Sequence, residues 1–192
     1  AGISSPLNSD DSDLSTQELC GITLGTHLGC LETMKTFWDK ATEKGARLAN
    51  PLLFSHSYLN SPISLCAIEF GLKGYHATFC SNQNSGLDAV RAAYDALRLG
   101  HVGLVVCGGV EAITPARELF EPQQKMGEAS VFFVLETCEH AALRKAKSQI
   151  EFSDDWFDVG KDMSTQVIET FGRCGGATSA LQLFQSLNFS QD

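Results

Sequence analysis

The order of apolar segments along the 192-residue chain predicts an α/β layered fold built around a mixed β-sheet. Residues 102–106 (VGLVV) form an uninterrupted apolar run, as expected for a strand buried on both faces. Residues 84–99 repeat apolar side chains at the spacing of one helix face. The segments around these two alternate between strand-like and helix-like patterns, which is typical of layered α/β proteins.

The first part of the chain has four predicted elements after a polar, acidic loop at 8–16. They are a buried strand at 19–26, a helix from 31 that ends at Gly45, a helix at 62–70, and a short strand at 76–80. Pro62 falls in the first turn of the second helix and Gly71 just past its end, where each residue is favoured.

The second part begins with the clearest helix, 84–99, which Gly100 ends. After it we expect a strand at 102–106, a tight turn at CGGVEA, a polar loop at 113–127, a buried strand at 129–137 and a helix at 138–147. Beyond about residue 150 the chain is acidic with no clear period, until an amphipathic helix at 179–189.

Charge and composition limit the classes of binding partner that the protein can have. The formal net charge is −9 and no run of Lys or Arg is present, which argues against nucleic acid and anionic membranes as partners. No apolar stretch approaches the roughly 20 residues of a membrane helix. The first residues lack the basic and apolar regions of a secretory signal. We therefore expect a cytoplasmic protein.

The seven cysteines are odd in number, none is spaced as C-x-x-C, and each lies in an apolar segment. Reduced cysteines acting as small buried hydrophobic residues explain this pattern better than metal or redox chemistry does. We expect no metal and no cofactor.

The segment HATFCSNQNSGLDAV places a turn between a strand and a helix. Such a turn directs backbone N–H groups and the positive end of the helix at whatever it holds, so nucleophiles are often found there. Gln83 occupies this turn. The alternative is an ordinary loop capped by Asn82, Asn84 or Ser85.

Several segments together resemble the β-ketoacyl synthases of fatty-acid and polyketide assembly. They are TLGTHLGCLETM, residues 51–71, GLKGYHAT, SGLDAVRAAYDALRLGHVGLVVCGGVEA and MGEASVFFVLET. The resemblance covers about 20–145 and implies a thiolase-like layered fold whose second half is truncated. Residues 1–147 then correspond to the N-terminal half, and 148–192 to a rudimentary remnant of the C-terminal half packed in the same domain.

The resemblance also assigns positions. Counting back from Glu111 by the family's interval places Gln83 where the nucleophilic cysteine would stand; a shifted register would place Cys80 there instead. An amide cannot form an acyl-enzyme. Within the family, glutamine here marks either the chain-length factor of a type II polyketide synthase or a domain that decarboxylates a malonyl group.

Active members of the family also carry two catalytic histidines, each in its own motif. The segment TFGRCGGATSALQL resembles the motif of the second histidine, with Arg173 at its position, and no G-T-G-T motif of the first histidine is present. None of the chain's five histidines falls in either motif. This favours a noncatalytic chain-length factor over a decarboxylase.

The resemblance implies a heterodimer with an active ketosynthase, and contact with an acyl carrier protein only through that partner. The helix after the first Gly-rich turn would line the end of the shared acyl tunnel. Its candidate lining residues are Thr33, Met34, Thr36 and Phe37, although Met34 and Phe37 could each equally be a core residue. A malonyl-carrier-protein decarboxylase using Gln83 and a noncatalytic acyl-chain-binding protein are the alternative functions.

Overall fold

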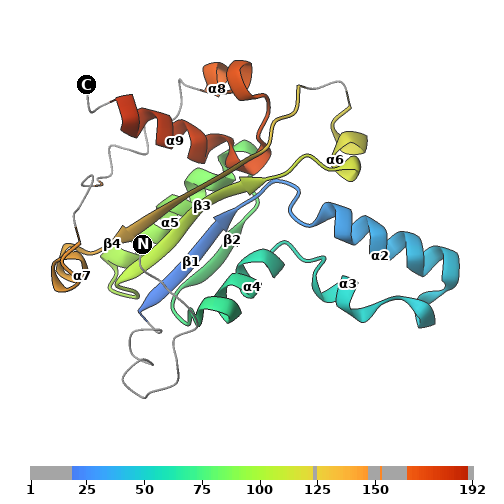
Figure 1. Ribbon diagram of the computed structural model, residues 1–192, viewed down its shortest axis with the longest axis horizontal. Coiled ribbons are helices and arrows are strands. Elements are labelled where there is room, and N and C mark those ends of the chain that lie inside the picture. Colours follow the sequence, from blue (N-terminus) through green and yellow to red (C-terminus); the bar gives the residue numbers. More distant parts are fainter. Residues whose placement is uncertain (1–18, 123–124, 147–151, 153–163, 190–192) are drawn as a thin grey trace.

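The computed structural model describes residues 19–122, 125–146, 152 and 164–189. Its sheet has the strand order β2-β1-β3-β4 (Figure 1). The strands are β1 (Cys20–Gly25), β2 (His76–Phe79), β3 (Leu104–Glu111) and β4 (Ala129–Glu136). β1 runs parallel to both of its neighbours, and β4 runs antiparallel to β3. The predicted α/β class and mixed sheet are therefore confirmed.

Helices cover the two faces of the sheet. The α-helices are α2 (Leu31–Lys44), α3 (Pro51–Ser55), α4 (Ser61–Phe70), α5 (Ser85–Arg98), α6 (Pro115–Phe120), α7 (Cys138–Leu143), α8 (Ser164–Phe171) and α9 (Thr178–Phe189). The short 3-10 turns are η1 (Ala46–Leu48), η2 (Asn82–Asn84) and η5 (Gly175–Ala177). α5 and α9 pack on one face, and α4 packs on the other (Figure 1).

The alternation of side chains along β1 explains this arrangement. Ile22 and Leu24 point to the α4 side, where they join a cluster with Ile63. Thr23 points to the α5 side, and its buried hydroxyl donates a 2.8 Å hydrogen bond to the carbonyl of Ala89. A strand with paired neighbours on both edges and helices on both faces is buried throughout, as its continuous apolar sequence predicted.

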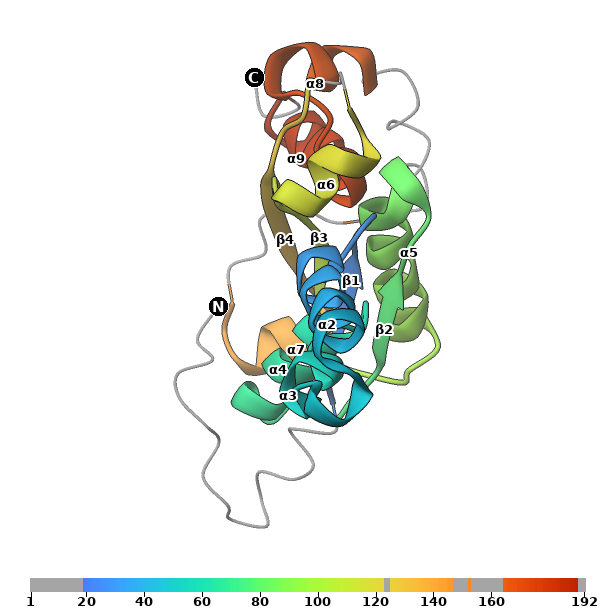
Figure 2. The same cartoon turned by 90° about the vertical axis from the view of Figure 1, so that its right-hand side faces the viewer.

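The α2–α3 arm, which we define as residues 31–55, stands apart from the sheet. In Figure 1 the arm extends sideways, and in the turned view of Figure 2 it lies nearest the viewer. None of the 14 residues of α2 is buried. The main neighbours of α2 are η1, α3 and α6. Gly45 ends α2 with a positive φ of 84°, as the sequence predicted.

Two predictions, one for β3 and one for β4, were wrong. The predicted turn CGGVEA instead lies largely within β3, which continues to Glu111. The glycines of this segment reflect crowding rather than turning: a Cβ on Gly108 would lie 2.0 Å from the carbonyl oxygen of Val131. β4 was expected to be buried, yet it is an edge strand whose alternate side chains are exposed, including Phe132 and Val134.

Three short helices were missed. α6 lies within the predicted loop 113–127, with Thr114 capping its first turn. α3 and α8 were also not predicted. Helices of five to eight residues are too short to show a clear apolar period. The predicted helix at 138–147 is observed as α7 and ends at Leu143.

The C-terminal helix α9 was predicted and is confirmed. Its buried Leu183 and Leu187 join the same core as Val90 of α5 and Val105 of β3. The predicted loop at 8–16, most of the acidic stretch after 150 and the boundary between 147 and 148 lie outside the described residues. In the part of the chain that the structure describes, no helix is long and apolar enough to cross a membrane.

Candidate functional site

The turn between β2 and α5 has the geometry that the sequence predicted for a reactive position. β2 ends at Phe79, and η2 leads directly into α5 at Ser85. The buried Ser85 hydroxyl accepts a 2.8 Å bond from the N–H of Ser81 and donates a 2.7 Å bond to the carbonyl of Asn82. Asn82 has a φ of 63°, in the left-handed region that asparagine tolerates. The turn is thus fixed by its own hydrogen bonds.

Glycines let two other segments, the end of β1 and η5, approach this turn closely. A Cβ on Gly25, at the end of β1, would lie 2.2 Å from the carbonyl carbon of Ser85. A Cβ on Gly86 would lie 2.9 Å from the carbonyl oxygen of Gly176, and one on Gly176 would lie 2.4 Å from Thr26. The ends of β1, α5 and η5 therefore meet backbone to backbone, and larger residues would separate them.

Glu111 ends β3 inside this junction and is 5% exposed. One carboxylate oxygen accepts from the backbone N–H groups of His27, at 2.6 Å, and Gly176, at 3.0 Å. The other accepts from the N–H of Leu28 at 3.2 Å. These bonds join the turn after β1 to the turn before α9.

Gln83 is the middle residue of η2, at the N-terminal end of α5, and is half-buried. It therefore lies immediately before the first turn of α5, whose N–H groups have no partner within the helix. η2 lies against η5, so the segment that follows Arg173 borders the turn that carries Gln83. A side-chain amide here can donate and accept hydrogen bonds but supplies no nucleophile.

Cys80 lies just after β2 and is exposed. Its thiol donates a 3.0 Å hydrogen bond to the carbonyl of His27. Partial burial of the thiol and, to a smaller extent, the negative charge of Glu111 raise the pKa of Cys80 above its ordinary value. Reactive cysteines have a lowered pKa, so the surroundings of Cys80 do not activate it.

Arg173 is held by its main chain, while its side chain is exposed. Its carbonyl accepts from the guanidinium of Arg117 at 2.6 Å and from the N–H of Gly127 at 3.0 Å. Arg117 is 1% exposed and also bonds the carbonyl of Gly127 and the carboxylate of Glu121. This buried arginine joins Glu121 and Gly127 to the segment that carries Arg173.

The candidate tunnel residues lie in another part of the structure, on α2. Thr33, Met34, Thr36 and Phe37 are all half-buried. The ring of Phe37 packs against Phe54 of α3, with centroids 5.3 Å apart. These residues thus belong to the α2–α3 arm, whereas Gln83 and Arg173 belong to the glycine-rich junction beside the sheet.

Sequence reasoning missed two residues of the junction. Glu111 served only to count the interval to Gln83, and Arg117 was assigned to a loop. Glu111 could have been found as a single carboxylate at the end of an apolar run. Arg117 could have been placed in a helix because Thr-Pro, a common helix start, precedes it. In the described residues, no group of three or more His, Cys, Asp or Glu is gathered as a metal site requires.

Comparison with known proteins relates this junction to a family. Residues 5–132 match the model of the β-ketoacyl synthase N-terminal domain. The chain is 27% identical over 161 residues to 3-oxoacyl-[acyl-carrier-protein] synthase 2 of Synechocystis sp., covering 71% of this chain and 38% of that protein. It is 29% identical over 168 residues to the ketoacyl synthase alpha subunit of the tetracenomycin polyketide synthase of Streptomyces glaucescens, covering 70% and 39%.

A solved structure extends the likeness in fold. The ishigamide ketosynthase/chain length factor superposes with a TM-score of 0.69 at 16% identity, covering 90% of this chain and 66% of that one. The chain therefore has the layered fold of these ketosynthases. It spans less than two fifths of the length of the two curated relatives above.

Proposed function

The chain belongs to the β-ketoacyl synthase family, and from this membership we propose that it is a noncatalytic chain-length factor. In this proposal it forms a heterodimer with an active ketosynthase and shapes the tunnel that holds the growing acyl or polyketide chain. The observation that carries the proposal is the position of Gln83, in the strand–turn–helix junction where the family places its nucleophile.

Cys80 is the competing nucleophile, and its surroundings argue against it. A nucleophile in such a junction gains most when its side chain meets the N–H groups at the helix N-terminus. The thiol of Cys80 instead donates to the carbonyl of His27, and its pKa is raised. A protonated thiol committed to a carbonyl acceptor is a poor nucleophile at neutral pH.

Arg173 supports the loss of catalysis independently. In the family's active members a histidine at this position helps to stabilise negative charge on the substrate. A guanidinium keeps its proton at all physiological pH values, so it cannot exchange protons as a histidine can. The turn of Gln83 and the segment of Arg173 are neighbours in the fold, so both altered positions lie at one junction.

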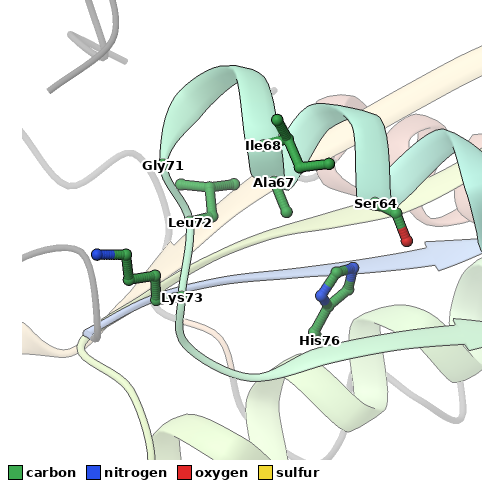
Figure 3. Close-up of a pocket in the computed structure, with 7 residues that line it drawn as sticks. All are labelled: Ser64, Ala67, Ile68, Gly71, Leu72, Lys73 and His76. Atoms are coloured by element: carbon green, nitrogen blue, oxygen red, sulfur yellow. The ribbon is translucent and has the colours of Figure 1, made fainter.

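The surface of the chain fits a partner of the same fold. In the part of the chain that the structure describes, β2 is an edge strand paired with β1 alone, and open edges attract further strands. Beside it, residues of α4 and the following turn, including Ile68, Leu72 and Lys73, line a shallow cavity of about 370 Å³ that His76 of β2 completes (Figure 3). Its lining combines the apolar side chains of Ala67, Ile68 and Leu72 with the polar residues Ser64, Lys73 and His76.

The α2–α3 arm and α4 add to this surface. Their large apolar side chains include several that are exposed, namely Trp38, Leu48, Leu52, Phe54, Leu65 and Ile68. So many exposed hydrophobic residues in one region are uncommon on a soluble monomer. We propose that the partner ketosynthase covers them.

The net charge of this chain favours docking of the acyl carrier protein on the partner ketosynthase. Acyl carrier proteins are acidic, and a subunit with a net charge of −9 repels them. We propose that the carrier protein docks on the ketosynthase subunit. Tight binding of a carrier protein to this chain alone would contradict that assignment.

Phe37 is the candidate whose truncation we expect to change the product. If α2 closes the end of a shared tunnel, Phe37→Ala removes a ring and opens space for a longer chain. We expect the product distribution of the heterodimer to shift by at least one extension unit toward longer chains, measured by mass spectrometry of the released products.

Phe184→Ala is the matched control, because it removes a ring of the same size that is 46% exposed and lies on α9, outside the α2–α3 arm. It should leave the product length unchanged. Equal shifts in both variants would mean that the loss of an aromatic ring in general, rather than the emptying of a tunnel, alters the product.

Co-expression with an active ketosynthase from the same organism tests the proposed partnership. We expect a stable 1:1 complex by size-exclusion chromatography and native mass spectrometry. A chain that stays monomeric in the presence of that ketosynthase would favour the alternative of an independent acyl-chain-binding protein.

A further inference from the structure

We infer that Glu111 is a positioning residue that fixes the main chains around Gln83, joining the β1 side of the site to the α9 side. The inference concerns this chain alone and does not require the proposed partner. One buried carboxylate thereby sets the relative positions of segments that lie far apart in sequence.

The carboxylate accepts three hydrogen bonds from backbone donors of two turns, and a longer one, 3.5 Å, from the hydroxyl of Thr26. The carboxylate oxygens accept from the N–H groups of His27, Leu28 and Gly176, at 2.6, 3.2 and 3.0 Å. A buried carboxylate is stable only where such bonds replace water. The same N–H groups, at the ends of two turns, would otherwise form an anion-binding cradle. The protein's own side chain fills that cradle.

His27 connects Glu111 to the turn that carries Gln83. The N–H of His27 is bonded to Glu111, and the carbonyl of His27 accepts the thiol of Cys80. Cys80 begins the turn that contains Gln83 three residues later. A shift in the turn after β1 would therefore alter the start of the turn that carries Gln83.

The α9 side is constrained in a similar way. Gly176 belongs to η5, which lies against η2. The preceding Gly175 leaves room for the carboxylate, because a Cβ there would lie 2.6 Å from Cγ of Glu111. Its φ of 48° is also in the left-handed region that favours glycine. The side chain of Glu111 thus fits the space that Gly175 leaves and holds the turn after β1 and the turn before α9 at a fixed separation.

Glu111→Gln is the informative variant because it has the same shape. A carboxylate accepts at both oxygens, whereas an amide offers one oxygen and an NH₂ group that opposes a backbone N–H. At least one of the three bonds is lost in either amide orientation. We expect maleimide to label Cys80 about tenfold faster, because one hydrogen bond to a charged group is lost and because removing the Glu111 charge lowers the pKa of the Cys80 thiol toward its ordinary value.

Peptide mass spectrometry separates the labelling of Cys80 from that of the other cysteines. Backbone hydrogen exchange at residues 27, 28 and 176 should also accelerate. Glu32→Gln is the matched control, since its carboxylate likewise accepts from a backbone N–H, that of Ala116, but makes no contact with the turn of Cys80. This control should leave the labelling of Cys80 unchanged.

Wild-type labelling and exchange rates in folded Glu111→Gln would overturn the inference, and so would equal acceleration in both variants. Glu111→Asp separates the two causes, because aspartate keeps the negative charge near Cys80 but is one methylene too short to reach both turns. It also replaces the glutamine variant where that variant does not fold. Its expected labelling rate is intermediate, and a wild-type rate would again overturn the inference. None of these outcomes depends on whether a ketosynthase binds.

Discussion

Replacing Gly25 by alanine is expected to lower the free energy of unfolding by about 3 kcal/mol or more, the upper range for overpacking a core. The added Cβ would lie 2.2 Å from both the carbonyl carbon and the carbonyl oxygen of Ser85. Neither is the end of a flexible side chain, so β1 and the start of α5 must separate. Urea denaturation followed by circular dichroism measures the loss.

Gly100→Ala provides the comparison for this variant. Gly100 has a φ of 72°, but no atom lies within 4 Å of a Cβ built there. Its cost is therefore backbone strain alone, about 1 kcal/mol. Equal losses in the two variants would mean that the contact between β1 and α5 is not what requires glycine at position 25.

Ile68→Asp is expected to weaken binding of the ketosynthase subunit by about 100-fold, a loss typical of a disrupted interface centre. Ile68 is 80% exposed in the isolated chain and lines the cavity beside the open edge of β2 (Figure 3). A charge that is tolerated in water becomes costly when a partner covers it. Isothermal titration or surface plasmon resonance gives the affinity.

Leu143→Asp is the control for that measurement. Leu143 is 79% exposed, on α7, and does not line the cavity. It should leave the affinity unchanged, and the unfolding free energy of both variants should stay close to that of the wild type. A folded Ile68→Asp variant with wild-type affinity would place the interface elsewhere.

The sequence predicted the elements that local rules determine. Val102–Val106 marked the strand now seen as part of β3, and the apolar period of 84–99 marked α5 within a residue or two. Gly45 and Gly71 were identified as helix ends, and both have positive φ values. Such signals depend on a few neighbouring residues, so one chain is enough to read them.

Other features depend on contacts between distant segments, which no local pattern encodes. Gly108 and Gly109 were taken as a turn, because crowding by Val131 and Gly176 cannot be seen from sequence neighbours. Phe132 and Val134 looked buried because β-strand composition does not reveal which strand lies at an edge.

The candidate site shows the same division. The strand–turn–helix around Gln83 could be predicted, and the structure places Gln83 in that turn. The role of Glu111 could not, because its partners come from residues more than 60 positions away. The assignment of Gln83 and Arg173 to vacated catalytic positions comes from family resemblance and stays a prediction.

Incubation of malonyl-carrier protein with the purified chain, with an active ketosynthase from the same organism, and with both together tests the central claim most directly. Mass spectrometry of the carrier protein detects acetyl and condensed products. We predict neither product from this chain alone and condensed product from the pair. Gln83→Ala should retain condensation in the pair, because only the ketosynthase supplies a nucleophile. Acetyl-carrier protein formed by this chain alone, and lost in Gln83→Ala, would contradict the account and identify a decarboxylase.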